Sequence, residues 1–259
     1  MDMTIHAESM IELLESVMEV AQRAGQVILD VYASDFAVRC KTDESPVTEA
    51  DARAEALIVA ALRNLTPDIP VVAEEAVAAG HVPTVADCFW LVDPLDGTKE
   101  FVSRNGEFTV NIALINDGRP VLGVVLAPAL GRLFAGAAGQ GAFVTDALGR
   151  RPIRCRPVPT EGLTVVASRS HGDTAALDRF LAGRNVASLI NAGSSLKLGL
   201  IAAGEADLYP RLGRTMEWDI AAGHAVLEAA GGMIASTAGE ELRYAKAGFA
   251  NPSFVAQAR

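Results

Sequence analysis

The chain of 259 residues is long enough for one large domain or for two smaller domains that share an interface. Half of its residues are hydrophobic and 5% are aromatic, which is typical of an ordinary globular protein with a mainly aliphatic core. A formal net charge of −10 argues against a nucleic-acid binder, since affinity for phosphate backbones needs clustered Lys and Arg. A small anionic substrate remains compatible with this charge if metal ions and a few local cations screen its site.

The cysteines and histidines form neither a zinc site nor a disulfide pattern. The three cysteines are widely spaced and include no CxxC pair, and the four histidines show no HxH or HExxH spacing. Such cysteine usage fits a reducing cytoplasm. The sequence has no basic leader and no apolar run near the ~20 residues that span a bilayer, so we expect a cytoplasmic protein without a transmembrane segment. Peripheral contact with the inner membrane and the oligomeric state are left open.

Two amphipathic helices are predicted at the start of the chain. Apolar residues recur at helical spacing over about 10–32, after a capping-box pattern of Ser9 and Glu12. Thr48 is the predicted N-cap of the second helix, with Asp51 in its first turn. The Asp51 carboxylate either complements the helix dipole or belongs to a site, and the local pattern fits both interpretations.

Strands dominate the next part of the chain. A short strand at 69–73 leads directly into Glu74 and Glu75. Two hairpins are then expected, in which 108–115 pairs with 121–126 and 133–138 with 142–145. The glycines at 139 and 141 do not follow the GxGxxG pattern between a strand and a helix, so a Rossmann-type nucleotide site is not predicted.

A turn with two carboxylates is the strongest local signal of chemistry. A short apolar run predicts a buried strand that ends at Asp93, and Asp96 follows three residues later. Pro94 and Gly97 allow the backbone to turn sharply twice. Asp93, Asp96 and the Leu95 carbonyl can then converge, and such an all-oxygen set suits Mg²⁺. The alternative is an ordinary surface turn, and carboxylates from elsewhere in the chain decide between the two.

A basic, proline-rich stretch at 150–159 is interpreted as a domain boundary. Beyond it, predicted strands and helices alternate: 163–167, 172–182, 186–190, 193–203, 207–209, 219–230 and 232–236. We therefore expect an N-terminal α+β domain at 1–155, carrying most of the candidate metal ligands. A C-terminal α/β domain at 156–259 is expected to carry Asp219 and substrate recognition.

Four carboxylates at the ends of separate predicted elements suggest a common site. Glu74, Asp93 and Asp96 follow strands, and Asp219 opens a helix, where capping is its alternative role. Brought together without cations, these side chains would repel one another strongly. Two or more divalent cations would remove the repulsion, and a two-metal site supports in-line phosphoryl displacement.

The chain resembles the inositol monophosphatase superfamily of Mg²⁺-dependent, lithium-sensitive phosphatases from about residue 10 to about residue 255. The resemblance is carried by four signatures in the family's order: 47–51, 74–75, 93–98 and 218–223. Within the superfamily it is most similar to CysQ-type 3′(2′),5′-bisphosphate nucleotidases, on segments 98–101, 104–111, 168–171, 193–197, 209–211 and 217–219. The resemblance implies a two-domain, layered α-β-α-β-α fold.

The resemblance also implies roles for individual residues. Two or three Mg²⁺ ions would be held by Glu74, Asp93, the Leu95 carbonyl, Asp96 and Asp219. Asp51 and Thr98 would form the catalytic pair that activates water. Substrate contacts would come from Glu74, Leu95, Asp96, Gly97, Thr98, Ser168, His171, Gly193, Ser194, Ser195, Lys197, Arg211 and Asp219. Candidates for the second phosphate are Lys197, Arg169, Arg211 and Arg214, with ordinary solvated cations as the alternative.

The implied activity is hydrolysis of the 3′-phosphate of adenosine 3′,5′-bisphosphate to AMP and phosphate. A metal-activated water would attack in line, without a covalent phosphoenzyme, and the enzyme would clear a by-product of sulfate assimilation. One alternative is an inositol-1-phosphate, histidinol-phosphate or fructose-1,6-bisphosphate phosphatase on the same scaffold. A non-catalytic nucleotide-binding regulatory protein is the alternative of another class, and the complete set of carboxylates argues against it.

Overall fold

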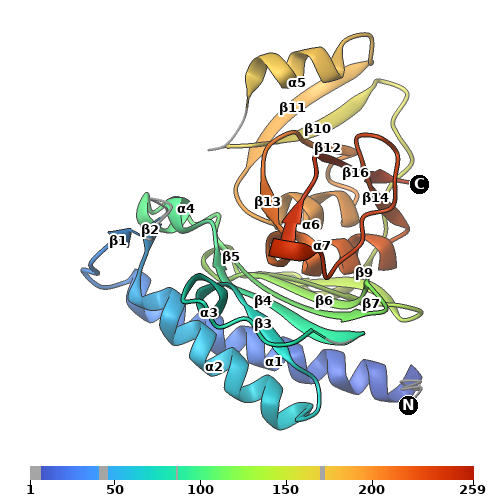
Figure 1. Cartoon of the computed structure of the whole chain (residues 1–259). Coiled ribbons are helices and arrows are strands. Elements are labelled where there is room, and N and C mark those ends of the chain that lie inside the picture. Colours follow the sequence, from blue (N-terminus) through green and yellow to red (C-terminus); the bar gives the residue numbers. More distant parts are fainter. Residues whose placement is uncertain (1–6, 41–45, 86, 170–172) are drawn as a thin grey trace.

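The protein consists of five stacked layers of helices and strands (Figure 1). The computed structural model describes residues 7–40, 46–85, 87–169 and 173–259. Helices α1 (Ala7–Tyr32) and α2 (Glu49–Leu65) form the first layer, and a seven-stranded sheet covers them. Helices α6 (Leu196–Ala202) and α7 (Glu217–Ala229) separate this sheet from a five-stranded sheet, and α5 (Thr174–Leu181) lies on the far side. The expected α-β-α-β-α arrangement is therefore confirmed.

The first sheet is almost entirely antiparallel, and only β3 and β4 run parallel. In order across the sheet, its strands are β3 (Val71–Ala73), β4 (Cys88–Asp96), β5 (Thr109–Asn116), β6 (Arg119–Ala127), β7 (Arg132–Ala137), β8 (Gly141–Asp146) and β9 (Gly149–Ile153). Because side chains alternate between the two faces of a strand, one run of apolar residues serves two cores. In β4, Trp90 and Val92 pack towards α1 and α2, whereas Phe89 and Leu91 pack towards α6 and α7.

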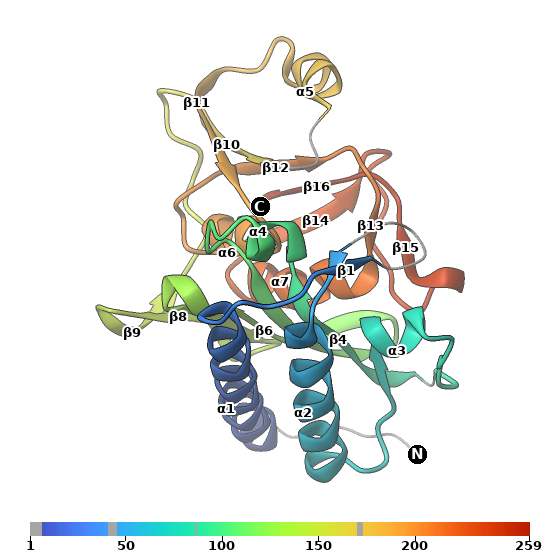
Figure 2. The ribbon, with the colours of Figure 1, turned by 90° about the vertical axis from the view of Figure 1, so that its left-hand side faces the viewer.

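The second sheet combines parallel and antiparallel pairs. In spatial order its strands are β11 (Val186–Ala192), β10 (Leu163–Ser168), β12 (Leu208–Arg211), β16 (Phe254–Ala258) and β14 (Gly232–Ser236). Strands β10, β11 and β12 run parallel, and β16 runs antiparallel to both of its neighbours. Figure 2 shows α5, β10 and β11 at the end of the molecule furthest from α1 and α2.

Short elements complete the fold around the edges of the two sheets. They are β1 (Arg39–Cys40), β2 (Pro46–Val47), α3 (Glu74–Ala78), α4 (Thr98–Val102), β13 (Thr215–Met216), β15 (Ala250–Asn251) and the 3₁₀ helices η1 (Pro128–Leu130) and η2 (Ala247–Phe249). Strand β1 pairs with β2, and β13 pairs with β15.

Most of the predicted elements are present, and the differences have local causes. Helix α1 begins at Ala7, so Ser9 lies inside the helix and the predicted cap is wrong. The strand predicted to begin at residue 69 begins at Val71. Residues 149–153 form the edge strand β9 rather than a linker. Pro152 is tolerated there because one side of an edge strand needs no backbone N–H to pair with a neighbouring strand. Strand β16 was not predicted from the sequence.

Helix α7 lies unusually close to the first sheet. A Cβ atom added at Gly123 in β6 would lie only 2.2 Å from the carbonyl oxygen of Ala222 in α7. Only glycine therefore permits this backbone approach. Helix α7 and the first sheet share one hydrophobic core, so the start of α7 is fixed relative to the strand ends. The division at residues 155 and 156 stays a prediction.

Candidate active site

The end of β4 presents two carboxylates through a local irregularity. The pairing of β4 with β5 shifts register between Asp93 and Asp96, and Pro94 lies in the shifted segment. The Asp93 carboxylate accepts the Leu95 N–H at 3.0 Å, which closes a tight turn. Gly97 follows with φ of 86° and caps α4. The predicted double turn is present, and it allows both carboxylates to lie at the same end of the strand.

Asp51 caps α2 and also accepts a hydrogen bond from Thr98. One carboxylate oxygen accepts the backbone N–H and the hydroxyl of Thr48, each at 2.8 Å, and so caps α2. Its other oxygen accepts the Thr98 hydroxyl at 3.4 Å. The Thr98 hydroxyl also lies 3.4 Å from the Leu95 carbonyl oxygen. The helix cap therefore orients Asp51, and the remaining oxygen is directed at Thr98.

Glu74 comes to the same place because β3 and β4 are parallel neighbours. Ala73 pairs with Val92, so the residue after β3 lies beside the end of β4. There the charge of Glu74 contributes to the raised pKa of Asp93. Glu74 begins α3, and the sequence did not predict this short helix. The Glu55 carboxylate caps α3 by accepting its first free N–H groups at 2.8 and 2.9 Å.

Asp219 joins the cluster from the opposite side of the sheet. It lies in the first turn of α7, where its carboxylate accepts the Met216 N–H at 2.8 Å. The close packing of α7 against β6 fixes the position of Asp219 relative to the ends of the strands. The capping role of Asp219 is thus present, and its membership of a metal site stays a prediction.

Burial and the neighbouring negative charges raise the pKa values of Asp93, Asp96 and Asp219. Burial, followed by the charges of Glu74, Asp96 and Asp219, raises the pKa of Asp93 well above its usual value. The pKa of Asp219 is raised well above the usual value by burial and then by Asp96. Burial raises the pKa of Asp96 to about 6, although the nearby Lys197 opposes this rise. Such a cluster is costly unless cations neutralise it.

Oxygen ligands of this kind fit Mg²⁺, which prefers carboxylates and carbonyls. Within the described residues, no three His, Cys, Asp or Glu side chains already surround a single point as a finished metal site. The mutual perturbation nevertheless shows that the carboxylates lie within electrostatic range of one another.

Two cations of the second half lie beside the carboxylates. Lys197 is 4% exposed and donates to the carbonyls of Ala192 and Ser194. Its pKa is lowered to about 8 by burial, while Asp96 acts in the opposite direction. Arg211 donates to the Ser168 hydroxyl at 2.7 Å, and its positive charge opposes the rise in the pKa of Asp219. The site therefore has a positive side as well as a negative one.

The Gly193–Ser195 segment is held against the first half of the chain. Gly193 N–H donates to Glu107 at 2.8 Å, and the Ser195 hydroxyl donates to Asn111 at 2.6 Å. The Ser195 backbone lies near enough to Asp96 to oppose the rise in the pKa of that carboxyl. His171 lies outside the described residues. Contact of these residues with substrate stays a prediction.

The remaining two candidate cations, Arg169 and Arg214, have partners outside the carboxylate cluster. The Arg169 guanidinium makes a bidentate ion pair with Glu107, with both distances at 2.8 Å. The exposed Arg214 lies 3.6 Å from the Met216 sulfur. These contacts favour a structural role for Arg169 and a solvated position for Arg214.

Sequence reasoning missed several polar residues that shape the site. Glu55 follows Asp51 by one helical turn, and this spacing would have placed both on one face of α2. Asn111 is found beside Asp93 only through the pairing of β4 with β5. Nothing in the local sequence distinguishes Glu100, which is 3% exposed and affects the pKa of both Asp96 and Lys197.

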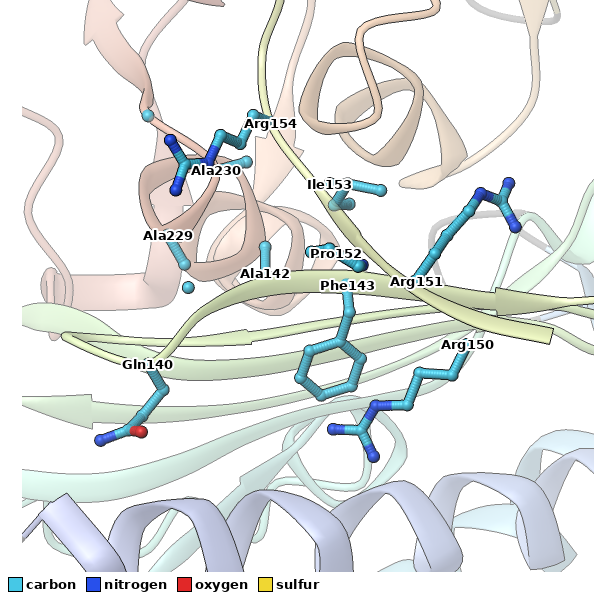
Figure 3. A pocket seen from close by; sticks show the side chains of 12 residues that line it. Gln140, Ala142, Phe143, Arg150, Arg151, Pro152, Ile153, Arg154, Ala229 and Ala230 are labelled. Carbon is cyan, nitrogen blue, oxygen red and sulfur yellow. The ribbon is translucent and has the colours of Figure 1, made fainter.

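A separate hollow of about 480 Å³ lies at the β8–β9 edge, near the end of α7 (Figure 3). Its lining includes Arg150, Arg151 and Arg154 but no acidic side chain. It therefore cannot supply the carboxylates of a metal site. No helix among the described residues is both long and apolar enough to cross a membrane.

Comparison with known proteins agrees with the fold. The model of the inositol monophosphatase family matches residues 9–258. The 3′(2′),5′-bisphosphate nucleotidase CysQ of Escherichia coli O157:H7 is 46% identical over 245 residues, covering 93% of this chain and 98% of the relative.

Solved structures show the same similarity in three dimensions. CysQ from Bacteroides thetaiotaomicron has a TM-score of 0.80 and 38% identity, covering 95% of this chain and 97% of that one. An inositol monophosphatase from Thermotoga maritima has a TM-score of 0.79 and 29% identity, covering 95% and 92%. Members of this family are generally Mg²⁺-dependent. Together with the layered fold and the carboxylates at the strand ends, these similarities show that the chain belongs to the inositol monophosphatase family.

Proposed function

We propose that this protein is a Mg²⁺-dependent 3′(2′),5′-bisphosphate nucleotidase that hydrolyses adenosine 3′,5′-bisphosphate to AMP and phosphate. The observation that carries the proposal is the position of Lys197 and Arg211 beside the carboxylate cluster. A substrate with two phosphates needs metal ions at the scissile phosphate and protein cations at the other. The relatives at 46% identity, which are named 3′(2′),5′-bisphosphate nucleotidases, support this choice.

The residues of the cluster fit the metal that the family uses. Two or three Mg²⁺ ions would be held by Glu74, Asp93, the Leu95 carbonyl, Asp96 and Asp219. Bound Mg²⁺ supplies polarisation of the phosphate and makes water a stronger acid. The N–H groups at the start of α4, at Gly97 and Thr98, would bind phosphate oxygens, as successive amides in a turn commonly do.

Thr98 and Asp51 would handle the proton of the attacking water. The Thr98 hydroxyl donates to Asp51, so its lone pair can accept a hydrogen bond from water and its own proton can pass to the carboxylate. The water oxygen bonds to phosphorus while the bond to the 3′ oxygen breaks. The 3′ oxygen leaves and takes up a proton, and no covalent phosphoenzyme forms.

Substrate recognition would use residues of the proposed C-terminal domain at 156–259. Arg211 already donates to the Ser168 hydroxyl at the ends of β10 and β12. We place the second phosphate near Lys197 and Arg211, and the nucleoside near Ser168, His171 and the Gly193–Ser195 segment. A cytoplasmic location, with or without contact with the inner membrane, stays a prediction.

A substrate panel at saturating Mg²⁺ tests the proposal. We expect kcat/KM for adenosine 3′,5′-bisphosphate to exceed that for inositol 1-phosphate, histidinol phosphate and fructose 1,6-bisphosphate by more than about tenfold. The two monophosphates leave the buried cation without a second phosphate, and fructose 1,6-bisphosphate lacks the nucleoside. A tenfold preference for inositol phosphate would assign the protein to the alternative phosphatases. Undetectable phosphate release with every substrate would favour a non-catalytic nucleotide-binding protein.

A further inference from the structure

Glu107 joins the first half of the chain to two separate segments of the second half. It lies between α4 and β5, and its carboxylate accepts two N–H groups of Arg169, both at 2.8 Å. The same carboxylate accepts the Gly193 N–H at 2.8 Å, and the Glu107 carbonyl accepts the Ser194 hydroxyl at 2.6 Å. One residue thus fixes the end of β10 and the loop between β11 and α6.

The loop that Glu107 holds has an unfavourable backbone conformation. Ser194 has φ of 38°, in the left-handed region that residues other than glycine usually avoid. A Cβ atom added at Gly193 would lie 2.7 Å from the Glu107 carbonyl oxygen, so the close approach requires glycine. Contacts with Glu107 therefore stabilise a conformation that the loop does not favour by itself.

This loop also carries groups that face the carboxylate cluster. The Ser194 carbonyl accepts the Lys197 ammonium group, and the Ser195 hydroxyl donates to Asn111, which pairs with Asp93 across β4 and β5. Gly97 packs directly against the loop, since an added Cβ there would lie 3.3 Å from the Ser194 Cβ. A shift of the loop would therefore move Lys197 relative to the turn that follows β4.

We propose that Glu107 is a positioning residue for substrate binding. Its ion pair with Arg169 and its hydrogen bonds to Gly193 and Ser194 hold the 193–195 loop in the conformation that binds the substrate beyond its scissile phosphate. The inference rests on the proposed nucleotidase function for the identity of that substrate. In this arrangement Arg169 is the structural partner of Glu107, and the carboxylates perform the chemical step without it.

Glu107→Gln tests the proposal through the separation of KM from kcat. Glutamine has one acceptor oxygen and no charge, so it cannot keep the bidentate ion pair with Arg169. We expect KM for adenosine 3′,5′-bisphosphate to rise about tenfold, the usual effect of losing a charge-assisted hydrogen bond. The kcat is expected to stay within about twofold, and KM for β-glycerophosphate, which offers only a scissile phosphate, is expected to stay unchanged.

Glu205→Gln is the matched control. Glu205 also pairs with an arginine of the first half, Arg132, with one contact at 3.1 Å, and this pair does not touch the 193–195 loop. The control should have wild-type kinetics. An equal fall of kcat with both substrates for Glu107→Gln, or an unchanged KM for the bisphosphate, would overturn the inference.

Hydrogen exchange provides a readout that needs no substrate. In Glu107→Gln and in Arg169→Met, we expect amides of residues 192–196 to exchange about tenfold faster than in the wild type, because local opening becomes easier. If the wild-type enzyme shows no preference for the bisphosphate, the proposed function fails but this measurement still applies. Unchanged exchange at 192–196 in both variants would show that Glu107 does not position the loop.

Discussion

Asp93→Asn is expected to abolish turnover and, at the same time, to stabilise the metal-free protein. Asp93 is 1% exposed, and burial together with the charges of Glu74, Asp96 and Asp219 holds its pKa well above the usual value. Asparagine has nearly the same shape, and its oxygen can still accept the Leu95 N–H that now lies at 3.0 Å. The substitution therefore removes a charge while the turn is retained.

The expected effects on activity and on stability have opposite signs. Loss of one metal ligand should lower kcat by at least about 10³-fold, because metal stabilisation of the transition state is worth several kcal/mol. Without metal, removing the charge of Asp93, the buried member of the four carboxylates, should stabilise the fold by ~2 kcal/mol, a fraction of the several kcal/mol that an unpaired buried ion costs. For a chain of this length, that is a rise in Tm of roughly 4–8 °C.

Phosphate release and calorimetry in EDTA and in Mg²⁺ measure both effects. Mg²⁺ should raise the Tm of the wild type, and most of this gain should be lost in Asp93→Asn. Asp117→Asn is the control, since Asp117 lies in the β5–β6 turn with φ of 49°, which asparagine tolerates. Wild-type activity in Asp93→Asn would refute the metal site, and a lower metal-free Tm would refute the electrostatic argument.

Thr98→Ala should lower kcat by about 10²–10⁴-fold with little change in KM, because the hydroxyl that donates to Asp51 at 3.4 Å is lost; a selective rise in KM in steady-state assays would contradict this. Gly123→Ala should cost about 1–3 kcal/mol in urea unfolding and reduce activity, because the new Cβ meets the Ala222 carbonyl and displaces α7; unchanged stability would refute the close packing. Burial raises the pKa of Asp207, but the ion pair with Arg156 outweighs burial, so the pKa in the folded protein lies below the usual value of 3.8. The ionised Asp207 therefore contributes its full stabilisation above pH ~4, and this contribution is lost as the pH falls through the lower pKa of the folded state. Asp207→Asn should therefore be less stable than the wild type at pH 7, and a difference that does not shrink towards pH 2 would contradict the assignment.

The elements that were predicted well depend on local patterns. The apolar stripe of α2, its Thr48 cap and the alternation within β4 and β5 are each specified within one segment. The carboxylates were recognisable for the same reason, since each follows a strand or opens a helix. The elements that were missed have few local signals: α3 and α4 have five residues each, and β16 depends on partners far away in the chain.

The contacts of Glu107, Asn111 and Glu55 could not be predicted in the same way. Each depends on which strands are neighbours and on which side of the sheet a helix packs. Asn111 lies beside Asp93 through strand register, and Glu107 lies 62 residues from Arg169 in sequence. Contacts of this kind arise only when the chain is folded, because sequence periodicity describes one element and not the pairing between elements.

By itself, the sequence determined the strand-end turn at Asp93–Thr98, the set of four carboxylates and the class of chemistry that such oxygens support. The tertiary structure alone decided how these groups meet. The parallel pairing of β3 with β4 places Glu74 beside Asp93, and the glycine contact between β6 and α7 places Asp219 opposite them. The physical reason is that residue type and local backbone conformation are set by short-range interactions, whereas the distances between distant carboxylates are set by packing.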